Sequence, residues 1–211
     1  MERSERIQWF LDALTEKLSQ TLPDQATTLI DEIEAAVPAI RQSNQSRVVD
    51  KPSINHLEMT SLLLASYRVL SNVMSDRDAI LDLMRQTMAE PLQAHMQMCL
   101  TQRFGIEPDA PKEAFEAAAM NFKQRGEQSF GKAFRYEQAV QTLEQSFVHI
   151  RRCFFNDFFR ANDAPALTPL FCFMDTLWAD ALHKGEYNVR FERPTTLAAG
   201  DDMCRFQFSR E

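Results

Sequence analysis

The hydrophobic pattern changes its period near Gly131, and this change constrains the fold more than any other feature of the sequence. Before it, apolar residues recur at three- and four-residue intervals, as at Ile7, Phe10 and Leu14. That spacing predicts amphipathic helices. After it, several short segments alternate between apolar and polar residues, which predicts half-buried β-strands. We therefore expect helices over residues 1–130 and a sheet in the remainder of the chain.

The C-terminal part contains four alternating segments and two helical ones. The strands are expected around residues 134–136 and over 145–152, 187–192 and 203–208. The helices are expected over 153–161 and 168–182. We predict an α+β fold, in which a helical N-terminal part packs with a C-terminal antiparallel β-β-α-α-β-β unit that carries its helices on one face of the sheet.

The N-terminal helices are interrupted by a polar stretch. Residues 42–52 lack periodicity, which predicts a linker. Asn55 followed by Glu58 resembles a capping box, so we expect the next helix to begin there. The sequence is accordingly divided into an N-terminal helical extension, residues 1–50, and an α+β domain, residues 51–211. The N-terminal helices are a candidate surface for a homodimer.

Composition excludes several classes of protein. The net charge of −7 argues against nucleic-acid binding, which needs a basic surface. No apolar stretch approaches the roughly 20 residues that span a membrane, and the charged first residues do not resemble a signal peptide. We expect a cytoplasmic protein with reduced thiols. No CxxC pair or clustered histidines occur, so we expect no metal and no cofactor.

Cys172 is the most informative candidate for chemistry. Thr168 followed by proline predicts a helix N-cap, which would place Cys172 near the first turn. A helix N-terminus favours the thiolate, whereas Asp175, one turn further on, opposes it. The dipole is expected to dominate only if Asp175 has a partner such as Arg193. The alternative is that Cys172 is a small buried apolar residue.

Three other residues carry weaker indications. Cys153 precedes an aromatic helix, and it is either part of a site or a core residue at the strand-to-helix junction. Cys204 shares a strand face with Phe206 and Phe208, so we expect it to be buried and inert. His149 either lines a pocket together with its strand face or is a satisfied or solvated histidine.

The segment FERPTTLAAGDDMCRFQF, residues 191–208, resembles the ending of the L-2-amino-thiazoline-4-carboxylic acid hydrolase family. Cys153 in RCFF, and Cys172 with Asp175 in PLFCFMD, match two further motifs of that family. The likeness covers roughly residues 115–210. The chain is more remotely similar to 4-vinyl-reductase-type ligand-binding domains.

The resemblance implies hydrolysis of 2-amino-2-thiazoline-4-carboxylate to N-carbamoyl-cysteine. Cys172 would then attack the ring carbon or polarise a water molecule, and Asp175 would shuttle protons. Arg193 would hold the substrate carboxylate, although a structural ion pair of Arg193 with Asp201 or Asp202 is an equal alternative. The other residues assigned to the site are Cys153 as a further catalytic thiol and, for substrate binding, Thr196, Asp201 and His149.

Two other functions stay open at this point. One is a non-catalytic small-molecule-binding or sensory module, whose pocket lies between sheet and helices. The 16 phenylalanines make an apolar pocket plausible, or they form the core. The other is a helical dimerisation unit fused to an inert α+β domain. For the hydrolase and for the binding module, the partner is a small molecule, and no nucleic acid or membrane is involved.

Overall fold

A computed structural model describes residues 5–107, 114–184 and 187–211 of the chain. The α-helices are α1 Glu5–Thr21, α2 Ala26–Ser43, α3 Lys51–Val73, α4 Arg77–Ala94, α5 Met96–Cys99, α6 Phe122–Phe130, α7 Phe154–Ala161 and α8 Thr168–Lys184. Shorter helical segments are η1 Gln45–Arg47, η2 Leu100–Phe104, η4 Glu116–Met120, η5 Gly131–Ala133, η6 Pro165–Leu167 and η7 Leu197–Ala199. The strands are β1 Arg135–Gln141, β2 Gln145–Arg152, β3 Val189–Glu192 and β4 Cys204–Arg210.

The four strands form one antiparallel sheet in the order β1-β2-β4-β3, which confirms the predicted fold class. In β2, β3 and β4 buried residues alternate with more exposed ones. Val148, Phe206 and Phe191 belong to the buried set. An antiparallel sheet with one apolar face needs helices on that face only, and α8, which lies between β2 and β3 in the observed order β-β-α-α-β-β, is one of them.

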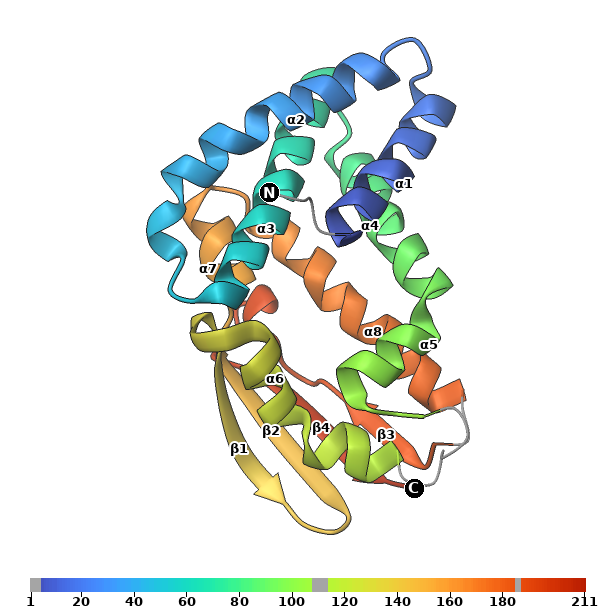
Figure 1. Ribbon diagram of the computed structural model, residues 1–211, viewed down its shortest axis with the longest axis vertical. Helices are drawn as coiled ribbons and strands as arrows, with labels where there is room; N and C mark the ends of the chain where they lie inside the picture. Colours follow the sequence, from blue (N-terminus) through green and yellow to red (C-terminus); the bar gives the residue numbers. More distant parts are fainter. Residues whose placement is uncertain (1–4, 108–113, 185–186) are drawn as a thin grey trace.

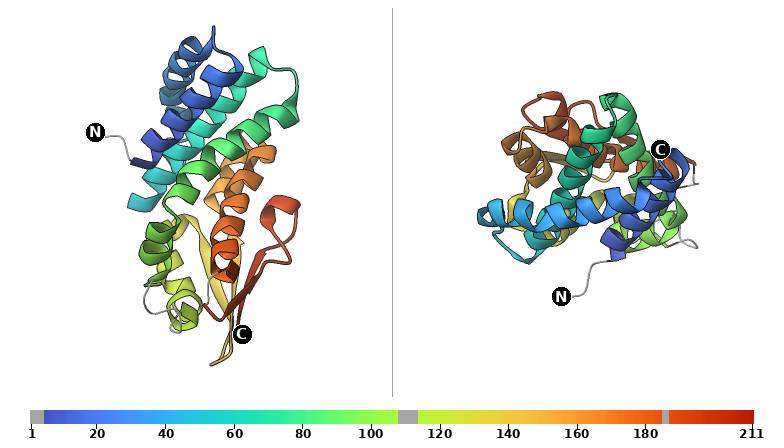
Figure 2. Two further views of the ribbon diagram at one scale, coloured as in Figure 1. Left: turned by 90° about the vertical axis from the view of Figure 1, so that its right-hand side faces the viewer. Right: turned by 90° about the horizontal axis from the view of Figure 1, so that it is seen from above.

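The helices cover the inner face of the sheet and then continue away from it. Helix α6 packs on β1, and α8 packs on β3 and α4 (Figure 1). Helix α2 packs on α3, and α1 on α4. The sheet occupies one end of an elongated molecule and α1–α4 the other (Figure 2). One continuous set of buried apolar side chains joins the two ends, with Trp178 fully buried between Phe104 and Phe191. None of the described helices is long and apolar enough to cross a membrane.

Helix α3 begins earlier than the sequence pattern predicted. Its N-cap is Asp50, whose carboxylate accepts a hydrogen bond from the Ser53 N–H at 3.0 Å, while the Ser53 hydroxyl oxygen accepts one from the Asp50 N–H. The expected cap at Asn55 with Glu58 is therefore wrong, because both residues lie inside the helix. A serine at the third helical position completes the capping box in place of the usual Glu or Gln.

Candidate active site

A cavity of about 790 Å³ lies between the helices and the inner face of the sheet. Small-molecule sites in proteins typically measure about 300–1,000 Å³. Side chains from α1, from α3 to α8, from η2 and from β1, β2 and β4 form its wall. All four cysteines line it, namely Cys99, Cys153, Cys172 and Cys204. The cavity is therefore the place where thiol chemistry of this chain would meet a ligand.

Helix α8 carries Cys172, but not in its first turn. The 3₁₀ turn η6 leads directly into α8, and Thr168 has helical backbone angles (φ −59°, ψ −43°). Thr168 is therefore not an N-cap, and its buried hydroxyl has no hydrogen-bond partner among the described residues. Cys172 is the fifth residue of α8, and the effect of a helix N-terminus falls off within one turn. The predicted dipole effect on Cys172 is wrong for this reason.

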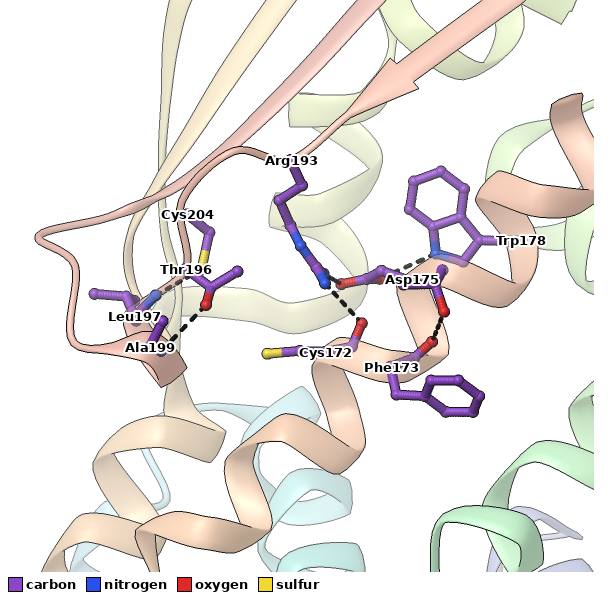
Figure 3. A network of polar contacts seen from close by, with 10 residues as sticks. Cys172, Phe173, Asp175, Trp178, Arg193, Thr196, Leu197, Ala199 and Cys204 are labelled. Carbon is purple, nitrogen blue, oxygen red and sulfur yellow. Dashed lines mark hydrogen bonds and ion pairs between the residues drawn. The ribbon is translucent and has the colours of Figure 1, made fainter. Parts of the chain in front are cut away.

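An ion pair between Asp175 and Arg193 lies beside Cys172 (Figure 3). Arg193 Nη1 donates to Asp175 Oδ2 at 2.7 Å, and Trp178 Nε1 donates to Asp175 Oδ1 at 3.0 Å. Arg193 Nη2 also donates to the backbone carbonyl of Cys172 at 3.0 Å. The two charged side chains are only 15% and 12% exposed. Asp175 thus has the partner that the sequence analysis named, and the alternative pairs of Arg193 with Asp201 or Asp202 are not formed.

Burial dominates the acidity of the Cys172 thiol. It raises the pKa of Cys172 to about 12, although the nearby Arg193 guanidinium lowers this pKa and the Asp175 carboxylate raises it further. The Cys172 sulfur points away from the Asp175 carboxylate, toward the loop that carries Thr196 and Leu197 (Figure 3). At neutral pH the unliganded site therefore holds a protonated thiol.

The other two thiols near the sheet are also kept neutral. Burial raises the pKa of Cys153 and of Cys204. The backbone N–H of Leu197 donates to the Cys204 sulfur at 3.3 Å, which lowers that pKa in part. Cys204 is buried with Phe206 and Phe208, as predicted. Its sulfur nevertheless belongs to the cavity wall, which the strand pattern did not indicate.

Three of the predicted substrate-binding residues do not line the cavity. Thr196 caps η7 by accepting a hydrogen bond from the Ala199 N–H at 3.2 Å. The Asp201 carboxylate accepts the Thr196 N–H at 2.8 Å, which is turn chemistry. His149 lies on the sheet face opposite that of Val148, which is the buried one. The structure thus brings Cys172, Asp175, Cys153 and Arg193 together and leaves these three outside.

Two functional groups of the wall were missed by the sequence analysis. His56 on α3 stacks on the Phe130 ring at 5.5 Å, and its Nε2 lies 3.1 Å from the Phe130 carbonyl oxygen. Arg125 on α6 also lines the cavity. Neither residue belongs to a local sequence motif. The pattern of the surrounding residues does not distinguish a polar side chain that faces a cavity from one that faces solvent. Only the packing of α3 and α6 against the sheet brings them to the site.

The donor groups of the cavity do not form a metal site. Among residues 5–107, 114–184 and 187–211, no three His, Cys, Asp or Glu side chains are arranged to hold a metal ion. The described side chains of the cavity wall that could take part in chemistry include four thiols, the buried Asp175 carboxylate, the imidazoles of His56 and His95 and two guanidinium groups.

Comparison with protein-family models identifies a match. A family model described as L-2-amino-thiazoline-4-carboxylic acid hydrolase matches residues 55–208. The matched region begins within α3 and ends within β4, so it includes β1, β2 and β3, most of β4 and most of the cavity wall. No curated protein matches the chain.

Proposed function

The chain belongs to the L-2-amino-thiazoline-4-carboxylic acid hydrolase family, and we propose that it opens a cyclic amidine such as 2-amino-2-thiazoline-4-carboxylate to N-carbamoyl-cysteine. The observation that carries this proposal is that Cys172 lines one cavity together with the Asp175–Arg193 ion pair. A nucleophile and a fixed carboxylate at one concave site suit hydrolysis at a polarised carbon.

The net reaction adds one water molecule to the ring. The ring bond between sulfur and the amidine carbon breaks, and the water oxygen becomes the new carbonyl oxygen. One hydrogen of water ends on the departing sulfur and the other on the ring nitrogen. The product therefore carries a free thiol and a urea group, which is N-carbamoyl-cysteine.

We assign the first step to Cys172. Its sulfur forms a bond to the amidine carbon while its proton moves to the ring nitrogen. The ring carbon–sulfur bond then breaks, and the departing sulfur takes a proton from the amino group, which leaves an isothiourea on Cys172. Water attacks that carbon, the bond to Cys172 breaks, and the two protons of water go to the Cys172 sulfur and to the imine nitrogen.

The charges beside Cys172 support this assignment. The neutral amidine would accept the thiol proton at its ring nitrogen as the carbon–sulfur bond forms, so a thiol whose pKa is about 12 can react without first ionising. The Asp175 carboxylate would accept hydrogen bonds from the amidine N–H groups. Arg193 acts as a positioning residue here, since its guanidinium already holds Asp175. We assign the buried thiol of Cys153 to hydrogen bonding with the departing sulfur.

The experiment is turnover of 2-amino-2-thiazoline-4-carboxylate, followed by release of free thiol. We expect activity in the wild-type chain and a loss of several orders of magnitude in Cys172→Ser, because a covalent nucleophile is removed. Cys99→Ser is the matched control, since Cys99 also lines the cavity but has no role in the scheme. It should keep its rate. Circular dichroism checks folding, and equal turnover of Cys172→Ser and wild type would contradict the mechanism.

A non-catalytic small-molecule-binding module is the second candidate function. The size of the cavity favours it, because about 790 Å³ is far more than one small ring requires. A cavity of about 150 Å³ already holds benzene. Absence of turnover by the wild-type chain, combined with tight binding of an apolar ligand, would favour this function over hydrolysis.

A further inference from the structure

The cavity is several times larger than the proposed substrate ring. Of the two arginines in its described wall, only Arg193 has a carboxylate partner among the described residues. We propose that the natural substrate is an amphipathic carboxylate, whose carboxylate binds Arg125 and whose planar apolar substituent lies among the aromatic side chains of the wall. This inference rests on the proposed function only in taking a five-membered ring as the reactive part.

The charges of the wall favour Arg125 over Arg193 as the anion-binding group. These are the two arginines of the described cavity wall. Arg193 is already neutralised by Asp175 at 2.7 Å. In contrast, no carboxylate of the described residues lies within ion-pair distance of the Arg125 guanidinium. A guanidinium without a counter-ion, at a partly buried site, selects a carboxylate because it offers two parallel N–H donors.

The local structure holds the Arg125 side chain in place. Its guanidinium lies against Gly105, which ends η2 with a positive φ of 70°. A Cβ at position 105 would lie 2.3 Å from Arg125 Nη2, so the guanidinium packs directly against the glycine backbone. The cation is therefore supported by the backbone of one segment while its own helix, α6, forms another part of the wall.

The remaining wall suits a flat apolar group. Aromatic side chains line much of the cavity, and one group of them comprises His56, Phe130, Phe134, Tyr136, Phe155 and Phe171. Phe155 and Phe171 stack with ring centroids 3.8 Å apart, and Phe155 meets Phe134 edge-on at 5.3 Å. Aromatic side chains prefer such stacked and edge-on partners. A planar substituent on the substrate would extend this arrangement and fill volume that a bare aminothiazoline leaves empty.

The test uses binding of thiazoles, which keep the ring and the carboxylate but cannot be hydrolysed. Isothermal titration compares 2-amino-5-phenylthiazole-4-carboxylate with 2-aminothiazole-4-carboxylate and with the uncharged 2-amino-5-phenylthiazole-4-carboxamide. We expect the phenyl acid to bind at least about tenfold more tightly than 2-aminothiazole-4-carboxylate, because its phenyl ring is buried in the cavity. We expect the phenyl carboxamide to bind at least about tenfold more weakly than the phenyl acid, because it lacks the charge.

Two variants on α6 identify the anchor. Arg125→Gln should weaken binding of the phenyl acid about tenfold or more and leave the carboxamide unchanged, and Arg125→Lys should restore part of the loss. Lys123→Gln is the matched control, because it removes one positive charge from the same helix at a residue outside the cavity wall. It should change neither affinity.

Three results would overturn the inference. One is equal affinity for acid and carboxamide. Another is equal weakening of both by Arg125→Gln. The third is loss of the preference for the acid in Arg193→Gln but not in Arg125→Gln, which would return the carboxylate to Arg193. The thiazole probes bind without turnover, so their affinities can be measured even if the protein does not hydrolyse the thiazoline. Conversely, turnover of 2-amino-2-thiazoline-4-carboxylate can be measured even if the binding results overturn this inference.

Discussion

At the scale of single residues, the acidity of Cys172 depends on competing neighbours. Burial raises its pKa most, Arg193 lowers it and Asp175 raises it. Because Arg193 and Asp175 are paired with each other, their opposing effects on the thiol partly cancel, and the cost of burying a thiolate decides the outcome. The reactivity of Cys172 without substrate is thus set by its surroundings and not by its place in α8.

We expect alkylation of native Cys172 by iodoacetamide to accelerate steadily between about pH 9 and pH 12. The thiolate is the reactive form, and its pKa is raised from 9.0 to about 12. The measurement is the labelling rate of the Cys172 peptide by mass spectrometry over this pH range. The same peptide in the urea-unfolded chain is the control, and its rate should level off above about pH 10, where an ordinary thiol is almost fully ionised. A plateau above about pH 10 in the native chain would contradict the effect of burial.

At the scale of elements, Asp50 joins the start of α3 to the turn η5. Its carboxylate accepts hydrogen bonds from Ser53 N–H at 3.0 Å and from Lys132 N–H at 2.5 Å. Burial would raise the pKa of Asp50, but these hydrogen bonds and the nearby His56 together lower it below 3.8. The hydrogen bonds that join the two helical segments therefore favour the ionised carboxylate.

We expect Asp50→Ala to lower the free energy of unfolding by about 1–2 kcal/mol at pH 7, the usual cost of losing an N-cap. Since the pKa is lower in the folded state, this stabilisation is present above about pH 4 and is lost as the pH falls further. Urea unfolding at pH 7 and at pH 3 measures the difference.

Asp76→Ala is the matched control for this prediction. Asp76 caps α4 by accepting hydrogen bonds from the N–H groups of Asp78 and Ala79, both of which belong to that helix. It should cost less than Asp50→Ala at pH 7. If the gap between wild type and Asp50→Ala were the same at pH 7 and pH 3, the carboxylate would not be the stabilising group.

At the scale of the whole molecule, the cavity exists because helices from distant parts of the chain close over one face of the sheet. Helix α6 approaches β1 through Gly126, which is buried. A Cβ at position 126 would lie 2.7 Å from Cε1 and Cζ of Tyr136. The absence of a side chain thus permits the close contact between α6 and the sheet on which this side of the cavity wall depends.

We expect Gly126→Ala to destabilise the protein by about 1–2 kcal/mol, because overpacking costs more than the roughly 1 kcal/mol gained in helix propensity. In the Tyr136→Ala background the same change should be neutral or stabilising, because the clash is gone. Gln128→Ala, an exposed position on α6, serves as the control and should change stability little. A neutral Gly126→Ala in the wild-type chain would contradict the packing argument.

The sequence alone determined the class and order of the elements. The switch in hydrophobic period predicted helices before Gly131 and four antiparallel strands after it, because each secondary structure repeats its apolar face at its own interval. The burial of Cys204 followed from the same alternation. Arg193 was named from the sequence as one possible partner of Asp175, because a carboxylate near a buried thiol needs a cation beside it.

Only the tertiary structure decided which side chains meet. Thr168 and the following proline are compatible with both a helix N-cap and the continuation of a 3₁₀ turn, and the packing of η6 selects the second. His149 was assigned to a pocket although a strand pattern with apolar residues on both faces does not say which face is covered. The convergence of Cys172 and Arg125 on one cavity depends on α6 and α8 closing over the sheet, and no local spacing encodes a distance between segments so far apart in the chain.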